Sequence, residues 1–515
     1  MRLPGRGSHT APAAAATALI ALLLASAWIG RAAISSDGAE VLSDTFGLLV
    51  TGRLESATMP PLRADPYFPA PHPFRSRYGA WPSLLLVPFL VPAWTFRASV
   101  GSAGLDAAAA LTWSVGAGLA AWGFLRLARV LRPDASPLWA PAFLAGTYLW
   151  PYAADSYFEP WAAAALALGA EQLLKAQQGR PGVPGVLAGL CVAAAALLKP
   201  LLWILAPVFV LAALLRSRGE PKPTALGLLT GGTATAALAC ALAVNLHRYG
   251  RITDFGYGYV GFPFDTPLLT GLAGLLVSPG RGLLFYAPVA ILALFGLRRL
   301  PAAPRVLCGI GPLVLLLVSA RWFSWHGASC WGPRLMLPVL PLLAAPAVLL
   351  PRAFVRSTLA VGAVVNLLGV LVAPGAWISY AERLRGPASS FWPQGGSDRV
   401  SVVPALAPPL GHAVLLARSA GLPVHVPWLP AGVEEGMPPP GAADCISPRI
   451  ARWALNLPPL VPMSPGLLGR VAVAEALRGR PEIAALFARE SLALDPLQRA
   501  APSLRSLAGE APTSN

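Results

Sequence analysis

The chain has 515 residues, of which 55% are hydrophobic and only 12% charged, and its mean hydropathy is +0.60. A water-soluble protein of this size cannot bury so much apolar surface, which excludes a soluble globular class and indicates that a bilayer surrounds most of the chain. The formal net charge of +16 comes from scattered arginines and lysines. It forms no basic domain or stripe, so a nucleic-acid-binding protein is not indicated.

Apolar segments follow one another along most of the sequence and predict an all-α polytopic membrane protein. Each of about eleven segments can cross a hydrocarbon core of roughly 30 Å. A further apolar stretch, 82–97, contains three prolines and is predicted to be a juxtamembrane or re-entrant helix. The first segment could pass for a signal peptide, but the many segments after it favour an uncleaved span. The predicted spans are 11–33, 104–130, 137–152, 158–174, 183–198, 200–215, 224–246, 283–297, 306–320, 333–351 and 357–375.

Basic residues lie in alternate loops, which is the pattern of the positive-inside rule. If the N-terminus is cytoplasmic, five basic loops in succession are cytoplasmic. The other side then carries a large first extracytoplasmic loop, 34–81, and the C-terminal region. We therefore expect a multi-pass plasma-membrane protein with an extracytoplasmic C-terminus. The five loops carry Arg126, Arg129 and Arg132; Lys175 and Arg180; Arg216, Arg218 and Lys222; Arg298, Arg299 and Arg305; and Arg352 and Arg356.

The sequence predicts two regions, a transmembrane domain at 1–375 and a small extracytoplasmic region at 376–515. The second region is less apolar and rich in proline and glycine. Its end, 466–510, has helical periodicity and resembles part of a tetratricopeptide-type helix pair. Stable repeat arrays normally need about three units, so two amphipathic helices that cover the membrane domain are an equal alternative.

The five cysteines show no C-x-x-C spacing, so a zinc site or a thioredoxin-like motif is not indicated. Cys330 and Cys445 both fall on the predicted outer side, where disulfides form. A bond between these two thiols is therefore a hypothesis.

Four of the carboxylates on the predicted outer side are candidates for catalysis. Asp37 and Glu40 follow the first span, and on a continuing helix their spacing places them on one face. A solvated interfacial pair is the alternative interpretation. Asp155 and Glu159 lie in a short turn, and Glu159 begins the next span, where a carboxylate needs a partner. Helix capping explains one acid of this second pair more easily than two.

Cations and aromatic rings lie on the same side. Lys199, between two apolar runs, either snorkels to the interface or binds an anion. Arg281 lies within a proline- and glycine-rich turn directly before a span, where a guanidinium suits bidentate contact with phosphate. The loop 321–334 contains three tryptophans, one histidine and two arginines. Such rings mark a membrane interface or stack on sugars. Its candidate substrate-binding residues are Trp325, His326 and Trp331, and its Arg334 is a candidate for contact with a phosphate.

Two stretches carry a resemblance to a known family. S-P-G-R-G-L-L-F-Y-A-P and W-H-G-A-S-C-W-G-P-R-L-M-L-P-V-L-P are similar to those of bacterial, dolichyl-phosphate-mannose-type members of the GT-C superfamily of integral-membrane glycosyltransferases. The order of the motifs and the topology over 11–375 also resemble this superfamily. The resemblance implies a sugar donor on a polyprenyl phosphate. It also implies transfer, with inversion, to a glycan, lipid or protein acceptor on the extracytoplasmic face.

The resemblance also implies roles for individual residues. Asp37 would be the general base that deprotonates the acceptor hydroxyl, opposite a phosphate that leaves without protonation. Asp155 and Glu159 would orient the acceptor or raise the basicity of Asp37. Many members of the superfamily have adjacent acids where this chain has D-G-A-E, which leaves open the role of Glu40 and any need for a divalent metal. The donor phosphate would be held by Lys199, Arg281 and Arg334.

Two other classes of membrane protein share features of this sequence. A flippase or transporter of lipid-linked sugars would share the spans and cations, but the middles of most predicted spans are uncharged, which disfavours it. A polysaccharide polymerase or ligase uses related chemistry and remains an alternative. The sequence has no Walker A or G-x-S-x-G motif in a supporting context, so NTP-driven pumping and serine hydrolysis lack support.

Overall fold

The structure is a computed structural model. It describes residues 10–29, 36–54, 78–179, 182–215, 223–255, 264–327, 330–372 and 407–419, together with 377, 401, 402, 404, 485 and 488. Within these ranges the chain is built from helices, which confirms the all-α prediction. The prediction of about eleven spans stays a prediction. Four described helices are long and apolar enough to cross a membrane: Ala107–Leu131, Thr224–Tyr249, Ala302–Arg321 and Arg352–Leu371.

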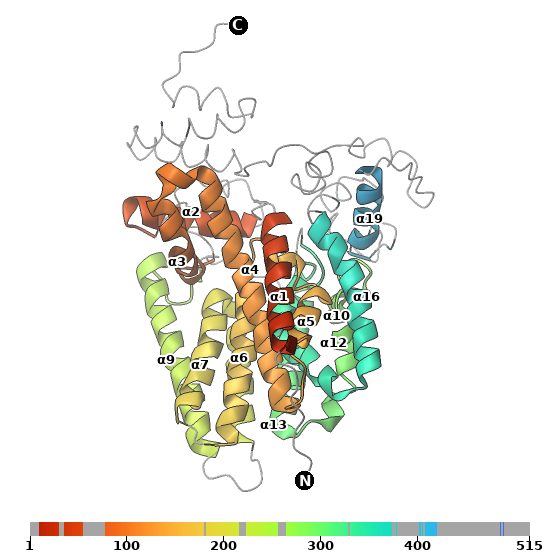
Figure 1. Ribbon diagram of the computed structural model, residues 1–515. Helices are drawn as coiled ribbons and strands as arrows, with labels where there is room; N and C mark the ends of the chain where they lie inside the picture. Colours follow the sequence, from red (N-terminus) through yellow and green to blue (C-terminus); the bar gives the residue numbers. More distant parts are fainter. Residues whose placement is uncertain are drawn as a thin grey trace.

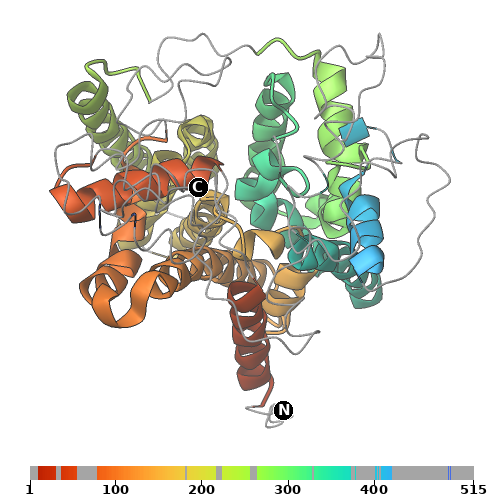
Figure 2. The ribbon, with the colours of Figure 1, turned by 90° about the horizontal axis from the view of Figure 1, so that it is seen from above.

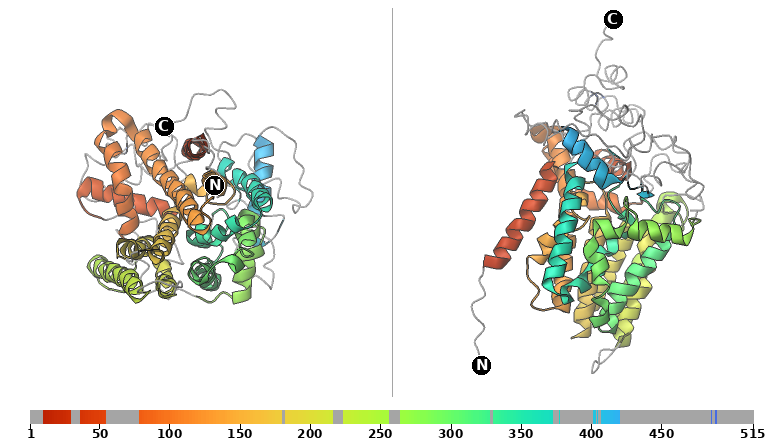
Figure 3. Two further views of the ribbon diagram at one scale, coloured as in Figure 1. Left: turned by 60° about the horizontal axis from the view of Figure 1, so that its bottom comes forward. Right: turned by 90° about the vertical axis from the view of Figure 1, so that its right-hand side faces the viewer.

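Of the three N-terminal helices, the first runs along the side of the bundle and the next two lie at one end of it (Figure 1). Helix α1 (Thr10–Ile29) leans away from the other helices at its lower end (Figure 3), and α2 (Ser36–Thr51) lies across the end of the bundle when seen from above (Figure 2). The sequence predicted a loop here, but the loop begins as a helix. Helix α2 packs on α3 (Trp81–Thr95). Thr45 and Ser83 each donate a buried hydrogen bond to the backbone of the other helix.

Four long helices lie side by side in the order α4, α6, α7, α9 (Figure 1). Small residues allow this close packing, as is usual in membrane bundles. A Cβ added to Gly123 of α4 would lie 3.0 Å from Ala167 Cβ, and one added to Gly169 of α6 would lie 2.9 Å from Cys191 Cβ. The helices of this half are α4 (Arg97–Leu131), α5 (Trp139–Ala145), η2 (Pro151–Ala153), α6 (Glu159–Gln177), α7 (Gly182–Leu198), η3 (Pro200–Leu205), α8 (Ala206–Leu214) and α9 (Pro223–Tyr249).

Apart from α16, the second half is made of shorter, broken helices, because prolines recur within its apolar runs. It includes α10, which lies between the predicted spans 224–246 and 283–297. The elements are α10 (Leu268–Val277), α11 (Leu283–Tyr286), α12 (Pro288–Ala293), η4 (Leu297–Arg299), α13 (Ala302–Arg305), η5 (Val306–Ile310), α14 (Gly311–Arg321), η6 (Arg334–Val339), α15 (Leu340–Ala344), η7 (Ala345–Leu349) and α16 (Arg352–Leu371).

The described part of the C-terminal region contains α19 (Pro408–Ser419), which packs against α16 (Figure 1). Its His412 ring lies 4.6 Å from the ring of Trp331, and His412 Nδ1 is 3.1 Å from the Leu368 carbonyl oxygen. The tetratricopeptide-like prediction for 466–510 falls outside the described residues, apart from 485 and 488, and so does Cys445. Cys330 is buried.

Candidate functional site

Proline fixes the backbone position of three charged residues. Pro160 occupies the first turn of α6, where a backbone N–H would have no partner within the helix, so its missing N–H costs nothing. Glu159 is therefore the first residue of the helix. Its carboxylate lies at the positive end of the helix dipole. Pro200 forces Lys199 into an extended conformation (φ −143°, ψ 97°), which ends α7. Gly332, at φ +63°, and Pro333 turn the chain into η6, so that Arg334 is its first residue.

Arg334 joins two of the predicted acids. Its Nη1 donates to Asp37 Oδ2 at 2.8 Å, and its Nε lies 3.6 Å from Glu159 Oε1. Lys199 Nζ also pairs with Glu159 Oε1. All of these side chains are largely buried: the exposed fractions are 12% for Arg334, 18% for Asp37 and 3% for Glu159. Alternating positive and negative groups therefore meet where α2, α6, α7 and η6 come together.

Asp155 adds a third carboxylate to this group. Its Oδ1 accepts a hydrogen bond of 2.8 Å from the backbone N–H of Ser156. A Cβ added to Gly38 would lie 2.3 Å from Ser156 Oγ, so only glycine lets α2 approach the Asp155 turn so closely. We refer to Asp37, Asp155, Glu159, Lys199 and Arg334 as the charged cluster.

The two aspartates of the cluster differ in their pKa values. Burial raises the pKa of Asp155 to about 7. The hydrogen bond from the Ser156 N–H and the positive charge of Arg334 partly oppose this rise, and the negative charges of Asp37 and Glu159 add to it. Burial also acts to raise the pKa of Asp37, but Arg334, Lys199 and a hydrogen bond from Tyr78 outweigh it and hold the pKa below its ordinary value. Asp37 is therefore ionised at neutral pH, whereas Asp155 is poised to gain or lose a proton.

Two tyrosines that the sequence analysis did not single out belong to the site. The Arg334 guanidinium lies 4.5 Å from the ring centroid of Tyr157, in a cation–π contact. Tyr152 donates from its hydroxyl to the Trp331 carbonyl oxygen at 2.9 Å. Both tyrosines lie within three residues of Asp155, and this proximity is the sequence signal that could have indicated them.

Arg281 contacts the 321–334 loop, which also carries Arg334 of the charged cluster. Its side chain is fully buried, and its Nη1 donates to the Cys330 carbonyl oxygen. Ser278 Oγ accepts a hydrogen bond of 3.1 Å from the Arg281 backbone N–H. Burial, followed by the positive charges of Arg281 and Arg334, lowers the pKa of His326 to about 3, so its imidazole is neutral at physiological pH.

The two predicted sugar-stacking tryptophans are enclosed by protein. Trp331 is fully buried, donates from Nε1 to Asn366 Oδ1 at 3.0 Å, and packs at a steep angle on Tyr286. Trp325 is 2% exposed and lies over Gly274, where an added Cβ would meet its ring at 2.1 Å. In this structure both rings pack against the protein, and their contact with a substrate stays a prediction.

Two further predictions concern Glu40 and metals. The Glu40 side chain lies outside the described residues, although its backbone belongs to α2. Within the ranges described, no three His, Cys, Asp or Glu side chains are grouped so as to hold a metal ion. Lys199 and Arg334 supply positive charge beside the carboxylates.

Comparisons with known proteins give little further information. No protein-family model matches the sequence, and no curated protein matches it significantly. Among solved structures, the chain is similar to ArnT from Cupriavidus metallidurans bound to undecaprenyl phosphate. The TM-score is 0.46 and the identity 16%, and the similarity covers 93% of this chain and 79% of that one.

Proposed function

We propose that the chain is a GT-C-like membrane glycosyltransferase, which transfers a sugar from a polyprenyl phosphate to an acceptor hydroxyl with inversion. The charged cluster is the observation that carries this proposal. It brings carboxylates and cations from four separate parts of the sequence to one buried place among largely apolar helices. Buried charges are costly and are retained in membrane proteins mainly where they serve function.

Asp37 is the candidate general base. It takes the proton of the acceptor hydroxyl, the acceptor oxygen attacks the anomeric carbon, and the bond from that carbon to the phosphate oxygen breaks. General base catalysis of this kind contributes about 10²- to 10⁴-fold. The lowered pKa keeps the Asp37 carboxylate free of a proton before the reaction. Asp155, next to Asp37 in the cluster, orients the acceptor, and its pKa near 7 allows it to donate or accept a hydrogen bond.

Arg334 and Lys199 are the candidate groups for the donor phosphate. Asp37 and Glu159 already hold these two cations in place through ion pairs. A donor phosphate that enters beside them would contact the same two cations. Positive charge fixed in advance stabilises the negative charge that grows on the leaving phosphate. Arg281, the third candidate for the donor phosphate, orients the 321–334 loop through its contact with the Cys330 carbonyl oxygen, and the neutral His326 of this loop is a candidate for contact with the sugar.

The proposal is tested by incubating the purified chain with polyprenyl-phosphate sugars and a panel of glycan, lipid and protein acceptors. We expect transfer, with loss of at least a hundredfold in Asp37→Asn. Asp134→Asn is the matched control, because Asp134 is exposed and lies outside the cluster. Transfer that is unchanged in Asp37→Asn would remove the catalytic assignment. Movement of the donor across a vesicle membrane without any transfer would favour the flippase alternative.

A further inference from the structure

A cavity of about 510 Å³ lies between α5 and α16, apart from the charged cluster. One face of α16 forms one wall of the cavity, with lining residues that recur about once per helical turn. Helix α5 forms the opposite wall. The volume falls within the range of ligand sites, which is roughly 300–1,000 Å³. The lining residues on α16 are Arg352, Arg356, Leu359, Ala360 and Ala363, and those in and before α5 are Ser136, Leu138, Trp139, Ala142 and Ala145.

Two glycines set the shape of this cavity. A Cβ on Gly362 would lie 2.1 Å from the Gly146 carbonyl oxygen, and one on Gly146 would lie 2.8 Å from the Leu359 carbonyl oxygen. The backbones of the two helices therefore touch at this point. The lining residues of α16 run from Arg352 to Ala363, which is next to Gly362, so the cavity is a wedge that narrows toward the Gly146–Gly362 contact. From Gly362 to Arg352 the helix rises about 15 Å, which is half the thickness of a hydrocarbon core of about 30 Å.

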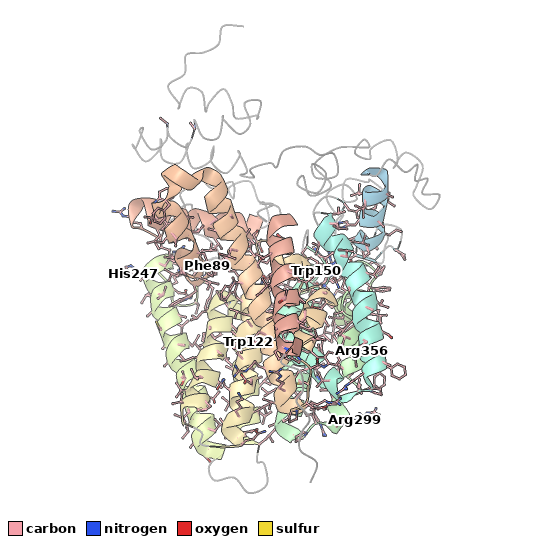
Figure 4. The ribbon with its side chains drawn as sticks, in the orientation of Figure 1. Phe89, Trp122, Trp150, His247, Arg299 and Arg356 are labelled. Carbon is pink, nitrogen blue, oxygen red and sulfur yellow. The ribbon has the colours of Figure 1, made fainter. Side chains whose placement is uncertain are left out.

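The walls and the mouth of the wedge differ in chemistry. The walls are alanine, leucine and the ring of Trp139, whereas the mouth carries Arg352 and Arg356, one turn apart and both exposed. Figure 4 shows Arg356 at the same end of the molecule as Arg299, one of the predicted cytoplasmic arginines. The wedge is therefore apolar over the depth of one leaflet, which suits an acyl chain. The two guanidinium groups at its mouth suit a phosphate headgroup.

The charges at the mouth favour an anionic lipid. Arg352 Nη2 lies 3.2 Å from Asp134 Oδ2, but the same carboxylate also pairs with Arg132 at 2.9 Å. Among the residues that the structure describes, no carboxylate pairs with Arg356. The mouth therefore keeps positive charge, which attracts anionic lipid.

We propose that this wedge binds one anionic glycerophospholipid, with its phosphate on Arg352 and Arg356 and an acyl chain between α5 and α16. Basic pockets between membrane helices are a general means of holding anionic headgroups. The bound lipid fills the space between α5 and α16, and so it stabilises the folded chain. This site is independent of the proposed transfer reaction.

The test uses the full chain, purified in detergent and stripped of lipid, and then titrated with phosphatidylglycerol or phosphatidylcholine of the same acyl chains. Bound lipids are counted by native mass spectrometry. We expect one phosphatidylglycerol to bind more tightly than phosphatidylcholine and to raise the unfolding temperature. The double variant Arg352→Gln, Arg356→Gln should lose roughly tenfold or more in phosphatidylglycerol affinity, with phosphatidylcholine unchanged.

Two controls separate this proposal from general lipid binding. Arg298→Gln removes an exposed arginine of η4 that does not line the cavity and should leave both affinities unchanged. Ala363→Phe fills the wedge and should weaken binding of both lipids. Equal phosphatidylglycerol affinity in the double variant and in Arg298→Gln would overturn the proposal. The proposal would also be overturned if folded Ala363→Phe bound both lipids as tightly as the wild type. Displacement of phosphatidylglycerol by equimolar polyprenyl phosphate would overturn it as well.

Discussion

Arg334 and Asp37 form an ion pair at 2.8 Å although 297 positions separate them in the sequence. Asp37 lies on a helix across the end of the bundle, and Arg334 begins a 3-10 helix deep in the second half of the chain. Their pairing fixes α2 on the rest of the bundle. It also sets the charge state of the proposed base.

Arg334→Gln should raise the pKa of Asp37. Arg334 is the largest of the influences that lower this pKa, and without it burial, which raises the pKa, is opposed only by Lys199 and the Tyr78 hydrogen bond. Infrared titration of the carboxylates should detect the change without any assay of function, and Arg334→Lys should restore part of the lowering. Arg305→Gln is the control, because its guanidinium donates to backbone carbonyl oxygens. An Asp37 titration that is the same in all variants would contradict the ion pair.

Asp155 should make the stability of the chain depend on pH. Its pKa is about 7 in the folded chain against an ordinary value near 3.8. Between about pH 4 and about pH 7, Asp155 binds a proton in the folded chain that it does not bind in the unfolded chain. The free energy of unfolding therefore falls as pH rises from about 4 to about 7, and above about pH 7 the contribution of Asp155 no longer changes. Asp155→Asn should flatten this part of the curve of unfolding temperature against pH. Asp134→Asn, at an exposed site, should leave that curve as in the wild type.

Glu159→Gln should destabilise the chain and abolish transfer. The change leaves Lys199 without its carboxylate partner, and the loss of one member of a buried pair costs about 3 kcal/mol. Glu171 is a matched control: it is also buried in α6, and it pairs with Arg126 and Lys175 at 2.8 and 2.5 Å. Glu171→Gln should lower the unfolding temperature by a similar amount while the remaining folded protein keeps its specific activity. Equal specific-activity losses in both variants would indicate that Glu159 has only a structural role.

Gly38→Ala should push α2 away from the Asp155 turn, because the added methyl group would overlap the Ser156 side chain. We expect a loss of about 1–3 kcal/mol in unfolding free energy, as for overpacking elsewhere, and a loss of transfer. Gly232→Ala on α9 is the control: nothing lies within 4 Å of its added Cβ, so the change should stabilise the helix by about 0.5–1 kcal/mol. A Gly38→Ala variant as stable and active as the wild type would contradict the close approach of α2.

Much of the architecture could be predicted from composition and periodicity. Apolar runs bounded by Glu159-Pro160, Lys199-Pro200 and Pro333-Arg334 gave the ends of three elements correctly, because proline acts on its own backbone and that of its neighbour. The apolar runs did not indicate α2 and α10, which lie between the predicted spans. A helix that lies across the end of a bundle, or one of ten residues, lacks the long apolar run of a span.

The sequence by itself determined that the chain is helical and immersed in a bilayer, and it indicated which charged residues lie at the ends of its apolar segments. Only the tertiary structure decided that Arg334 joins Asp37 and Glu159, that Lys199 shares Glu159, and that Trp331 packs inside the protein. Local backbone preference acts over a few residues and places each charge at a helix end. Which charges become partners depends on how helices distant in sequence pack, and on the cost of burying a charge without a partner.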